Sequence, residues 1–286
     1  MSTLAGYFDI RNRRKRERLV ANSLGLLVLV LMVFPTYWMV ATAFKPSRDI
    51  LRFEPKWVPS PATIENFSDA LNRPYFWENV RNSVVVVCVV VLLSLAIGFL
   101  AALAIARFRF YGRRAFIAVI IGVQMIPTTA LIIPLYILLA RAGQVDRLSG
   151  VMITYLTFVL PFTIWVLRGF VMGIPRELEE AAMVDGCTRF GAFLRILLPL
   201  IVPGLVATSL FAFVQAWNEF IFAYVLLNSQ ENQTLTVWLA SFTTLRGTDW
   251  GPLMAAATLT SLPVVIFFAI VQRRVAFGLT AGAVRG

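Results

Sequence analysis

The side chains that could do chemistry in this chain are few, and their types do not favour catalysis. The sequence contains no histidine, which removes the commonest general base and metal ligand. Its two cysteines, Cys88 and Cys187, fall in different predicted regions and are not expected to form a disulfide. No lysine follows a glycine, so the sequence lacks a G-x-x-x-x-G-K phosphate loop. We therefore predict no catalytic residue and no metal site, and no cofactor bound by this chain itself.

One acidic residue, Glu219, stands inside a long apolar segment, next to Trp217 and Asn218. A carboxylate in lipid is costly, so Glu219 is expected to face the helix bundle or a water-filled path. Two interpretations remain open. The three residues line the route of a polar solute, with the indole as a stacking face and the amide as a hydrogen-bonding group. Alternatively, Glu219 makes a structural hydrogen bond to a neighbouring helix or to a partner subunit.

A charged segment, residues 175–199, interrupts the apolar part of the chain with the pattern of a helix, a tight turn and a second helix. Three glutamates place negative charge at the positive end of the first helix dipole, and Gly186 suits the left-handed position that ends a helix. Thr188 can cap the second helix, and Pro199 is expected to stop it. The segment either lies on lipid headgroups or docks with a cytoplasmic protein. Its glutamates favour docking, because the inner leaflet is itself negative.

The elements that must position these residues are membrane helices. Of the 286 residues, 59% are hydrophobic and 14% are charged, and the mean hydropathy is +0.77, which is typical of a membrane protein. Each of six apolar segments has roughly the 20 residues needed to cross about 30 Å of hydrocarbon. We therefore predict an all-α membrane protein with six transmembrane helices. The predicted spans are about 19–44, 82–106, 115–140, 148–170, 200–227 and 250–272.

Two of these spans have special features. The first follows a basic arm, residues 1–18, and its apolar run is too long for a signal-peptide core, so an uncleaved helix is expected. The third contains Pro127 and Pro134, which are expected to kink it.

Arginine and lysine are unequally distributed between the two sides of the predicted bundle. The basic arm and residues 107–114 carry many arginines, whereas the acidic and basic residues of the loop 45–81 nearly cancel. By the positive-inside rule both termini and the segment 175–199 lie in the cytoplasm. The net charge of +11 reflects this topology, and we do not expect nucleic-acid binding.

The segment 175–199 contains the pattern E-A-A-x3-G-x9-I-x-L-P, with every fixed position present. It resembles the EAA loop of the membrane subunits of ATP-binding cassette importers. With the stretches QAWNEFIFAYVLL (215–227) and QRRVAFGLTAGAVRG (272–286), the chain is similar to the smaller membrane subunit of carbohydrate importers of the maltose-permease type. The resemblance spans nearly the whole chain and implies the type I importer permease fold, with both termini in the cytoplasm.

The resemblance also implies a non-catalytic subunit of a sugar importer in the bacterial plasma (inner) membrane. In that family two different membrane subunits form the pathway in the lipid bilayer. Two ATPase subunits bind the ATP, and an extracytoplasmic binding protein delivers the sugar. The residues implied to couple this chain to an ATPase subunit are Glu180, Ala181, Ala182, Asp185, Gly186, Ile196, Leu198 and Pro199. The tail, residues 273–286, is implied to contact the ATPase subunits through Gly278, Leu279, Thr280 and Gly282.

Two alternatives to a sugar importer remain. An importer of another solute, such as glycerol phosphate, would carry the same coupling loop. A secondary transporter would be expected to have repeated halves, broken helices and several coupling-ion carboxylates, whereas this chain has one intramembrane acid and no evident repeat.

Overall fold

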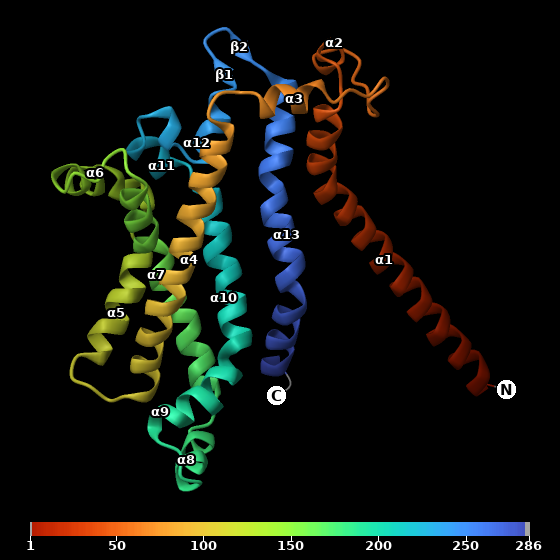
Figure 1. Ribbon diagram of the computed structural model, residues 1–286. Helices are drawn as coiled ribbons and strands as arrows, with labels where there is room; N and C mark the ends of the chain where they lie inside the picture. The colour runs from red at the N-terminus through yellow and green to blue at the C-terminus, as the bar shows by residue number, and fades with distance from the viewer. Residues whose placement is uncertain (1, 284–286) are drawn as a thin grey trace. The chain divides into compact units, whose positions relative to one another are not determined.

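The structure, a computed structural model, describes residues 2–283, with side chains placed for residues 17–272, and its regular structure is almost entirely helical (Figure 1). This agrees with the predicted all-α class. The chain divides into two compact units. The first contains the chain up to Asn72 together with Phe242–Leu259. The second contains Arg73–Ser241 together with the chain from Thr260 onward.

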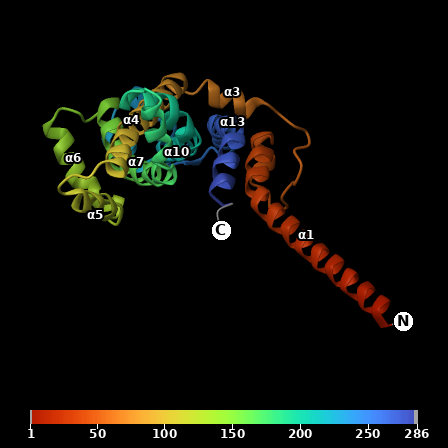
Figure 2. The same cartoon turned by 90° about the horizontal axis from the view of Figure 1, so that it is seen from below.

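Three long helices form the centre of the second unit. These helices, α4 (Phe76–Arg107), α7 (Leu148–Gly173) and α10 (Leu198–Asn218), lie side by side in both ribbon views (Figures 1 and 2). Glycines allow the close approach. A Cβ atom added at Gly98 of α4 would lie 2.5 Å from the Thr163 side chain of α7, and one added at Gly204 of α10 would lie 2.6 Å from the ring of Phe170. Small residues at helix contacts hold a membrane bundle together, because lipid supplies no hydrophobic force between helices.

The third predicted span is not one kinked helix but two helices. Helix α5 (Arg113–Gln124) ends before Pro127, and the chain continues as a 3₁₀ turn, η1 (Thr128–Leu131), and helix α6 (Ile132–Arg141). The two parts are bent by 99° at the break. Pro127 explains the position, because proline lacks an N–H group and disfavours helical geometry in the residue before it. Pro134 lies in the first turn of α6, where proline is tolerated, and causes no separate kink.

Pro199 does not stop the helix before the fifth span, which corrects the sequence prediction. Helix α9 (Arg189–Ala192) continues through a π-helical turn, η2 (Phe193–Leu197), into α10. At the end of this turn the N–H of Leu198 bonds to the carbonyl of Phe193, five residues back. The wider turn accommodates Pro199, which cannot donate the bond that a regular helix requires at its position.

The fifth predicted span also ends earlier than expected. Instead of reaching residue 227 it stops at Asn218, and a short helix, α11 (Ile221–Leu226), follows after a break at Glu219. A 3₁₀ turn, η3 (Gln230–Asn232), and helix α12 (Leu235–Ala240) complete this region.

Asp146, in the loop between α6 and α7, holds the chain that follows α11. Its carboxylate accepts hydrogen bonds from the backbone N–H groups of Asn228 and Ser229, both at 2.9 Å, and from the Ser229 hydroxyl at 2.5 Å. Its carbonyl accepts a bond from the Asn232 amide at 3.0 Å, and its own N–H donates to the carbonyl of Leu226 at 2.7 Å. The α6–α7 loop and the region 226–232 are therefore fixed to each other through one residue.

The first unit contains helices α1 (Ser2–Ala43), α2 (Ser47–Ile50) and α3 (Glu65–Leu71), and a hairpin of β1 (Thr243–Thr244) and β2 (Gly247–Thr248). Helix α13 (Trp250–Ala283) begins in this unit and continues into the second. Asn66 of α3 joins this helix to the end of α1, because its amide donates to the carbonyls of Ala43 and Lys45, both at 2.8 Å.

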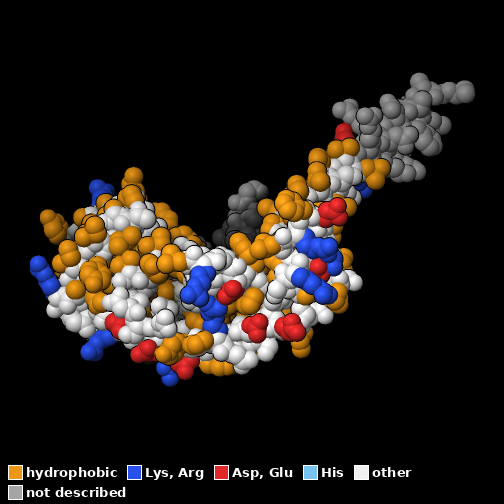
Figure 3. All heavy atoms as spheres, turned by 90° about the horizontal axis from the view of Figure 1, so that it is seen from above, with side chains coloured by type: hydrophobic (Ala, Val, Ile, Leu, Met, Phe, Trp, Pro, Cys, Tyr) orange, Lys and Arg blue, Asp and Glu red, His pale blue; other side chains and the backbone are white. Residues whose placement is uncertain are grey.

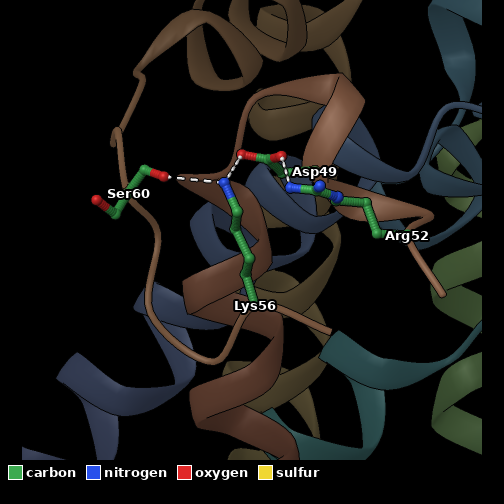
Figure 4. Close-up of polar contacts among 4 residues, drawn as sticks. All are labelled: Asp49, Arg52, Lys56 and Ser60. Atoms are coloured by element: carbon green, nitrogen blue, oxygen red, sulfur yellow. Dashed lines mark hydrogen bonds and ion pairs between the residues drawn. The ribbon is translucent and has the colours of Figure 1, made fainter. Parts of the chain in front are cut away.

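A charge cluster closes the loop that follows α2 (Figure 4). Lys56 Nζ lies 2.7 Å from one carboxylate oxygen of the buried Asp49 and 3.1 Å from the Ser60 carbonyl, and Arg52 lies 3.2 Å from the other oxygen. The hydrogen bond from Lys56, with the nearby positive charges, holds the pKa of Asp49 below its ordinary value although burial opposes the shift. The loop is thereby tied down by an acid that remains charged.

Five helices in the described part of the chain are long and apolar enough to cross a membrane, and the bent pair α5–α6 makes up to six. The predicted number of six transmembrane spans therefore requires that the pair α5–α6 crosses the bilayer as one span. In the view from above, the end that carries α3 and the hairpin shows Lys and Arg side chains beside Asp and Glu side chains (Figure 3). This mixture is what the near-balance of charge in residues 45–81 predicts.

Candidate functional site

The segment 175–199 folds as the sequence predicts around its turn. Helix α8 (Glu177–Val184) carries three glutamates in its first turn. It ends at Gly186, whose φ of +90° lies in the left-handed region that favours glycine. The N–H of Cys187 bonds to the carbonyl of Ala182 at 2.9 Å and that of Gly186 to Met183 at 3.1 Å, which is the Schellman arrangement of a helix end. Thr188 then caps α9, because its hydroxyl accepts the N–H of Gly191 at 3.0 Å.

Two arginines attach this helix–turn–helix to the end of the α4 span. Arg107, the last residue of α4, lies 2.7 Å from the Glu179 carboxylate and also donates to the carbonyl of Ile174 at 2.9 Å. Arg176 donates in the other direction, to the carbonyls of Ala106 at 3.0 Å and Arg107 at 3.1 Å. The start of α8 is therefore bonded directly to the end of α4. Sequence reasoning used Arg107 only for topology and did not consider Arg176, although their position beside the ends of two helices, where carbonyls lack partners, was a usable signal.

The predicted coupling residues divide into an outward and an inward group. Glu180, Ala181, Asp185 and Gly186 are exposed, and the surface around the turn is open. Ala182, in contrast, is 8% exposed and packs inside the chain. Of the three predicted residues at the end of the segment, Ile196 and Leu198 are half-buried and Pro199 is exposed.

A groove of about 550 Å³ lies between the end of α4 and the segment α8–η2. Its walls combine apolar and aromatic side chains with the guanidinium groups of Arg107, Arg176 and Arg189. The other residues that line it are Leu100, Leu103, Phe108, Glu179, Glu180, Met183, Phe190, Ala192 and Phe193. The turn, the exposed face of α8 and this groove lie together at one end of the bundle (Figure 1).

A pocket of about 230 Å³, which has polar side chains in a mostly apolar lining and which we call the polar pocket, lies where two broken helices meet. One wall comes from η1, just after the break at Pro127, and another from the break between α10 and α11. Helix breaks expose backbone groups, and they are tolerated in membranes where they line a cavity or are buried in protein. The polar side chains that line the pocket are Thr128, Thr129, Tyr155, Gln215, Asn218 and Glu219.

Glu219 forms a cap at the break. Its carboxylate accepts the N–H groups of Phe222 at 2.9 Å and Ala223 at 3.2 Å, the first orphan donors of α11. Its carbonyl, freed by the break, accepts the hydroxyl of Thr236 at 2.7 Å and that of Tyr155 at 3.4 Å. Glu219 thus has a structural role within this chain, as the cap of α11, and it also lines the pocket.

Trp217 and Asn218 point in different directions. The Trp217 indole is 7% exposed, and its Nε1 donates to the carbonyl of Thr260 on α13 at 3.1 Å, so its ring does not line the pocket. Asn218 is exposed and does line it. The predicted tail contacts, Gly278, Leu279, Thr280 and Gly282, lie outside the residues whose side chains the structure describes.

Comparisons with known proteins agree with the resemblance. The family described as binding-protein-dependent transport system inner membrane component matches residues 94–280. The diacetylchitobiose uptake system permease protein DasC of Streptomyces coelicolor is 45% identical over 269 residues, 94% of this chain and 98% of the relative. The trehalose/maltose transport system permease protein MalG of Thermococcus litoralis is 32% identical over 270 residues, 92% of this chain and 95% of the relative.

Solved structures give the same result for the fold. A chain in the crystal structure of a bacterial ABC transporter involved in the import of the acidic polysaccharide alginate matches with a TM-score of 0.77. The match covers 91% of this chain and 97% of that one, at 21% sequence identity.

Proposed function

The chain belongs to the family of binding-protein-dependent transport system inner membrane components, and from this membership we propose that it is a permease subunit of an ATP-binding cassette importer of carbohydrates. Its fold is that of the type I importer permeases, as predicted. The observation that carries the choice of carbohydrate is the likeness to a diacetylchitobiose permease over nearly the full length of both chains. The transported sugar is a di- or oligosaccharide.

The proposal includes the partners that such a subunit needs. A second membrane subunit completes the pathway in the bacterial inner membrane, an extracytoplasmic binding protein delivers the sugar, and two ATPase subunits bind and hydrolyse ATP. This chain is non-catalytic and binds no cofactor. The orientation has both termini in the cytoplasm, in line with the positive charge of the N-terminal arm and of residues 107–114.

Coupling follows from the attachment of α8 to α4. The exposed residues Glu180, Ala181, Asp185 and Gly186 form the surface that docks with an ATPase subunit. When the ATPase subunits close, α8 moves as a rigid piece, and the Arg107–Glu179 pair and the Arg176 bonds transmit this movement to α4. Because α4 packs against α7 and α10, the movement reaches the helices that bear the polar pocket.

The polar pocket is the part of the sugar path that this chain contributes. Its hydroxyl and amide groups can exchange hydrogen bonds with sugar hydroxyls. Asn218 is the predicted path residue best placed for this, and Glu219 supports the pocket wall by capping α11. Trp217 bonds α10 to α13 through its indole N–H and stacks on Phe213 of its own helix, so it offers no stacking face to the sugar.

A glycerol phosphate importer and a secondary transporter remain the alternatives. Broken helices, which we expected of a secondary transporter, do occur in this chain, so that part of the argument against it does not apply. The family and the coupling segment nonetheless favour an ATP-driven importer.

The proposal is tested by reconstituting the complete importer in vesicles, with its binding protein and labelled N,N′-diacetylchitobiose on the binding-protein side. We expect accumulation that requires ATP and that unlabelled disaccharide, but not glycerol 3-phosphate, inhibits. This chain purified alone should hydrolyse no ATP. Uptake driven by an ion gradient without ATP would overturn the proposal, and uptake of glycerol 3-phosphate with no saccharide uptake would favour that alternative.

A further inference from the structure

A second polar pocket, of about 560 Å³, lies at the N-terminal end of α4, between that end and the region α11–α12. Its volume falls within the range of about 300–1,000 Å³ that is common for small-molecule sites. It is distinct from the pocket at the helix breaks, and the two share no lining residue. Six side chains of this outer pocket carry the inference: Arg73, Tyr75, Tyr224, Gln230, Gln233 and Trp238.

Two exposed tyrosine rings border the outer pocket. Tyr75 is 39% exposed and Tyr224 is 60% exposed. Tyr75 is also held in the left-handed backbone region, with φ of 63° and ψ of 15°, immediately before α4. A bulky residue in this conformation costs free energy, and such positions are concentrated at functional sites. The backbone conformation at Tyr75 therefore sets the direction in which its side chain leaves the chain.

Two glutamine amides in the outer pocket have no partner within the described residues. The side chains of Gln230 and Gln233 make no hydrogen bond there, although each carries two donors and an acceptor. Their backbone, in contrast, is fixed. The Asn82 amide of α4 donates to the carbonyls of Glu231 at 2.8 Å and Gln233 at 3.1 Å.

The floor of the outer pocket is made rigid by side-chain bonds to backbone carbonyls. Trp238 Nε1 donates to the carbonyl of Pro74 at 3.1 Å, and Arg73 donates to the carbonyl of Ser241. The Trp238 ring, which lines the pocket, packs on Phe76 at 5.1 Å between centroids. Preformed walls with a few unpaired polar groups are what a small-ligand site requires.

We propose that this outer pocket binds a saccharide on the extracytoplasmic side before it enters the pocket at the helix breaks. Tyrosine faces accept the apolar faces of sugar rings, and the glutamine amides pair with ring hydroxyls or acetamido groups. Helix α11 joins the two sites, because Ile221 and Phe222 line the inner pocket and Tyr224 lines the outer one. This inference rests on the proposed function, which supplies the orientation and the substrate class.

The test uses the complete importer in vesicles and N,N′-diacetylchitobiose that bears a photoreactive diazirine. Labelled peptides are identified by mass spectrometry, with and without excess unlabelled disaccharide. We expect competed labelling of residues 73–75 and 224–241. The variants Tyr224→Ala and Gln230→Ala should each lower this labelling roughly fivefold, because each removes one stacking or hydrogen-bonding contact. The same variants should raise KM for uptake more than they lower the maximal rate.

Matched controls are Tyr111→Ala and Gln124→Ala, which remove an exposed tyrosine and a glutamine outside both pockets and should leave labelling and KM unchanged. Sugar uptake that proceeds normally while labelling is confined to the inner pocket would overturn the outer site and leave the proposed function standing. Labelling of residues 73–75 that unlabelled disaccharide does not compete would also overturn it, because such labelling is not specific for the saccharide. Failure of the importer to accumulate any saccharide would overturn the proposed function, and this inference with it.

Discussion

The coupling turn requires a residue with a left-handed backbone conformation at position 186, and Gly186 provides it. Its φ of +90° suits glycine, and no atom would lie within 4 Å of an added Cβ, so the backbone rather than crowding restricts this position. A left-handed backbone costs an L-residue roughly 1–2 kcal/mol and is especially unfavourable for a β-branched one. We predict that Gly186→Val abolishes coupled sugar uptake while membrane insertion is retained, measured as uptake per amount of inserted protein.

The control for this prediction is Gly186→Asn, because asparagine tolerates the left-handed region better than other residues with a side chain. It should keep most of the uptake. Equal uptake by the valine variant and the unmodified protein would show that the turn does not couple the subunits.

Asp146 makes the loop region 226–232 sensitive to pH. Burial raises the pKa of its carboxyl, but hydrogen bonds from Ser229, Asn228 and Asn232 outweigh this and hold the pKa below its ordinary value of 3.8. A group with a depressed pKa stabilises the folded state fully above the unfolded value, and this contribution is lost as pH falls through the folded-state pKa. We predict that the loop stays closed at neutral pH and opens at pH values below 3.8.

Hydrogen exchange, corrected for its intrinsic pH dependence, measures this opening. Amides of residues 226–232 should lose protection below that pH while those in the middle of α7 keep theirs. Asp146→Asn should lower loop protection at neutral pH roughly tenfold, because it weakens hydrogen bonds to a charged acceptor. Protection that is independent of pH in this loop would contradict the assigned role.

At the scale of the element, the break between α10 and α11 depends on its cap. Glu219→Ala removes the acceptor of two N–H groups and should destabilise α11 by about 0.5–2 kcal/mol. Glu219→Gln keeps one acceptor oxygen and removes the charge. We predict that uptake falls in the alanine variant and is largely restored in the glutamine variant. Equal loss in both would mean that the negative charge of Glu219, and not only an acceptor oxygen, is required.

The elements that could be predicted are those specified by local sequence. The apolar length of α4 and α7, the left-handed glycine after α8 and the threonine cap of α9 all follow from residues within a few positions. The breaks could not be placed in the same way. A proline indicates that a helix is disturbed, but whether it kinks, bends by 99° or is absorbed by a π-helical turn depends on the packing around it.

The site residues show the same division. The outward face of α8 was predicted from a local motif, whereas the inward position of Ala182 was not. The role of Arg107 depends on Glu179, which is distant in sequence and was not paired with it. The end of α10 at Asn218 was missed because Glu219 was counted as a residue inside a span and not as the cap of a new helix.

For the whole molecule, the native cysteines report the proposed orientation. Cys187 is half-buried beside the coupling turn, and Cys88 lies within α4, one of the candidate membrane spans. A membrane-impermeant maleimide should label Cys187 in inside-out vesicles without ATPase subunits, and not in right-side-out vesicles. Cys88 should stay unlabelled in both, because it lies within a candidate membrane span that an impermeant reagent does not enter. Loss of the signal in Cys187→Ser is the control, and the reverse labelling pattern would contradict the orientation.

The right-angled bend after α5 has a consequence for the lipid around the protein. Helix α5 has 12 residues and is about 18 Å long, which is short of the roughly 30 Å of a bilayer core. Helix α6 is bent by 99° relative to α5, so it does not extend α5 across the bilayer. The acyl chains beyond the end of α5 therefore have no helix of this pair beside them. Thinning the bilayer there costs a fraction of a kcal/mol for each ångström of mismatch. The second permease subunit of the proposed importer could instead cover this end of α5. Transport should therefore depend on acyl-chain length, with α5 as the element that senses bilayer thickness.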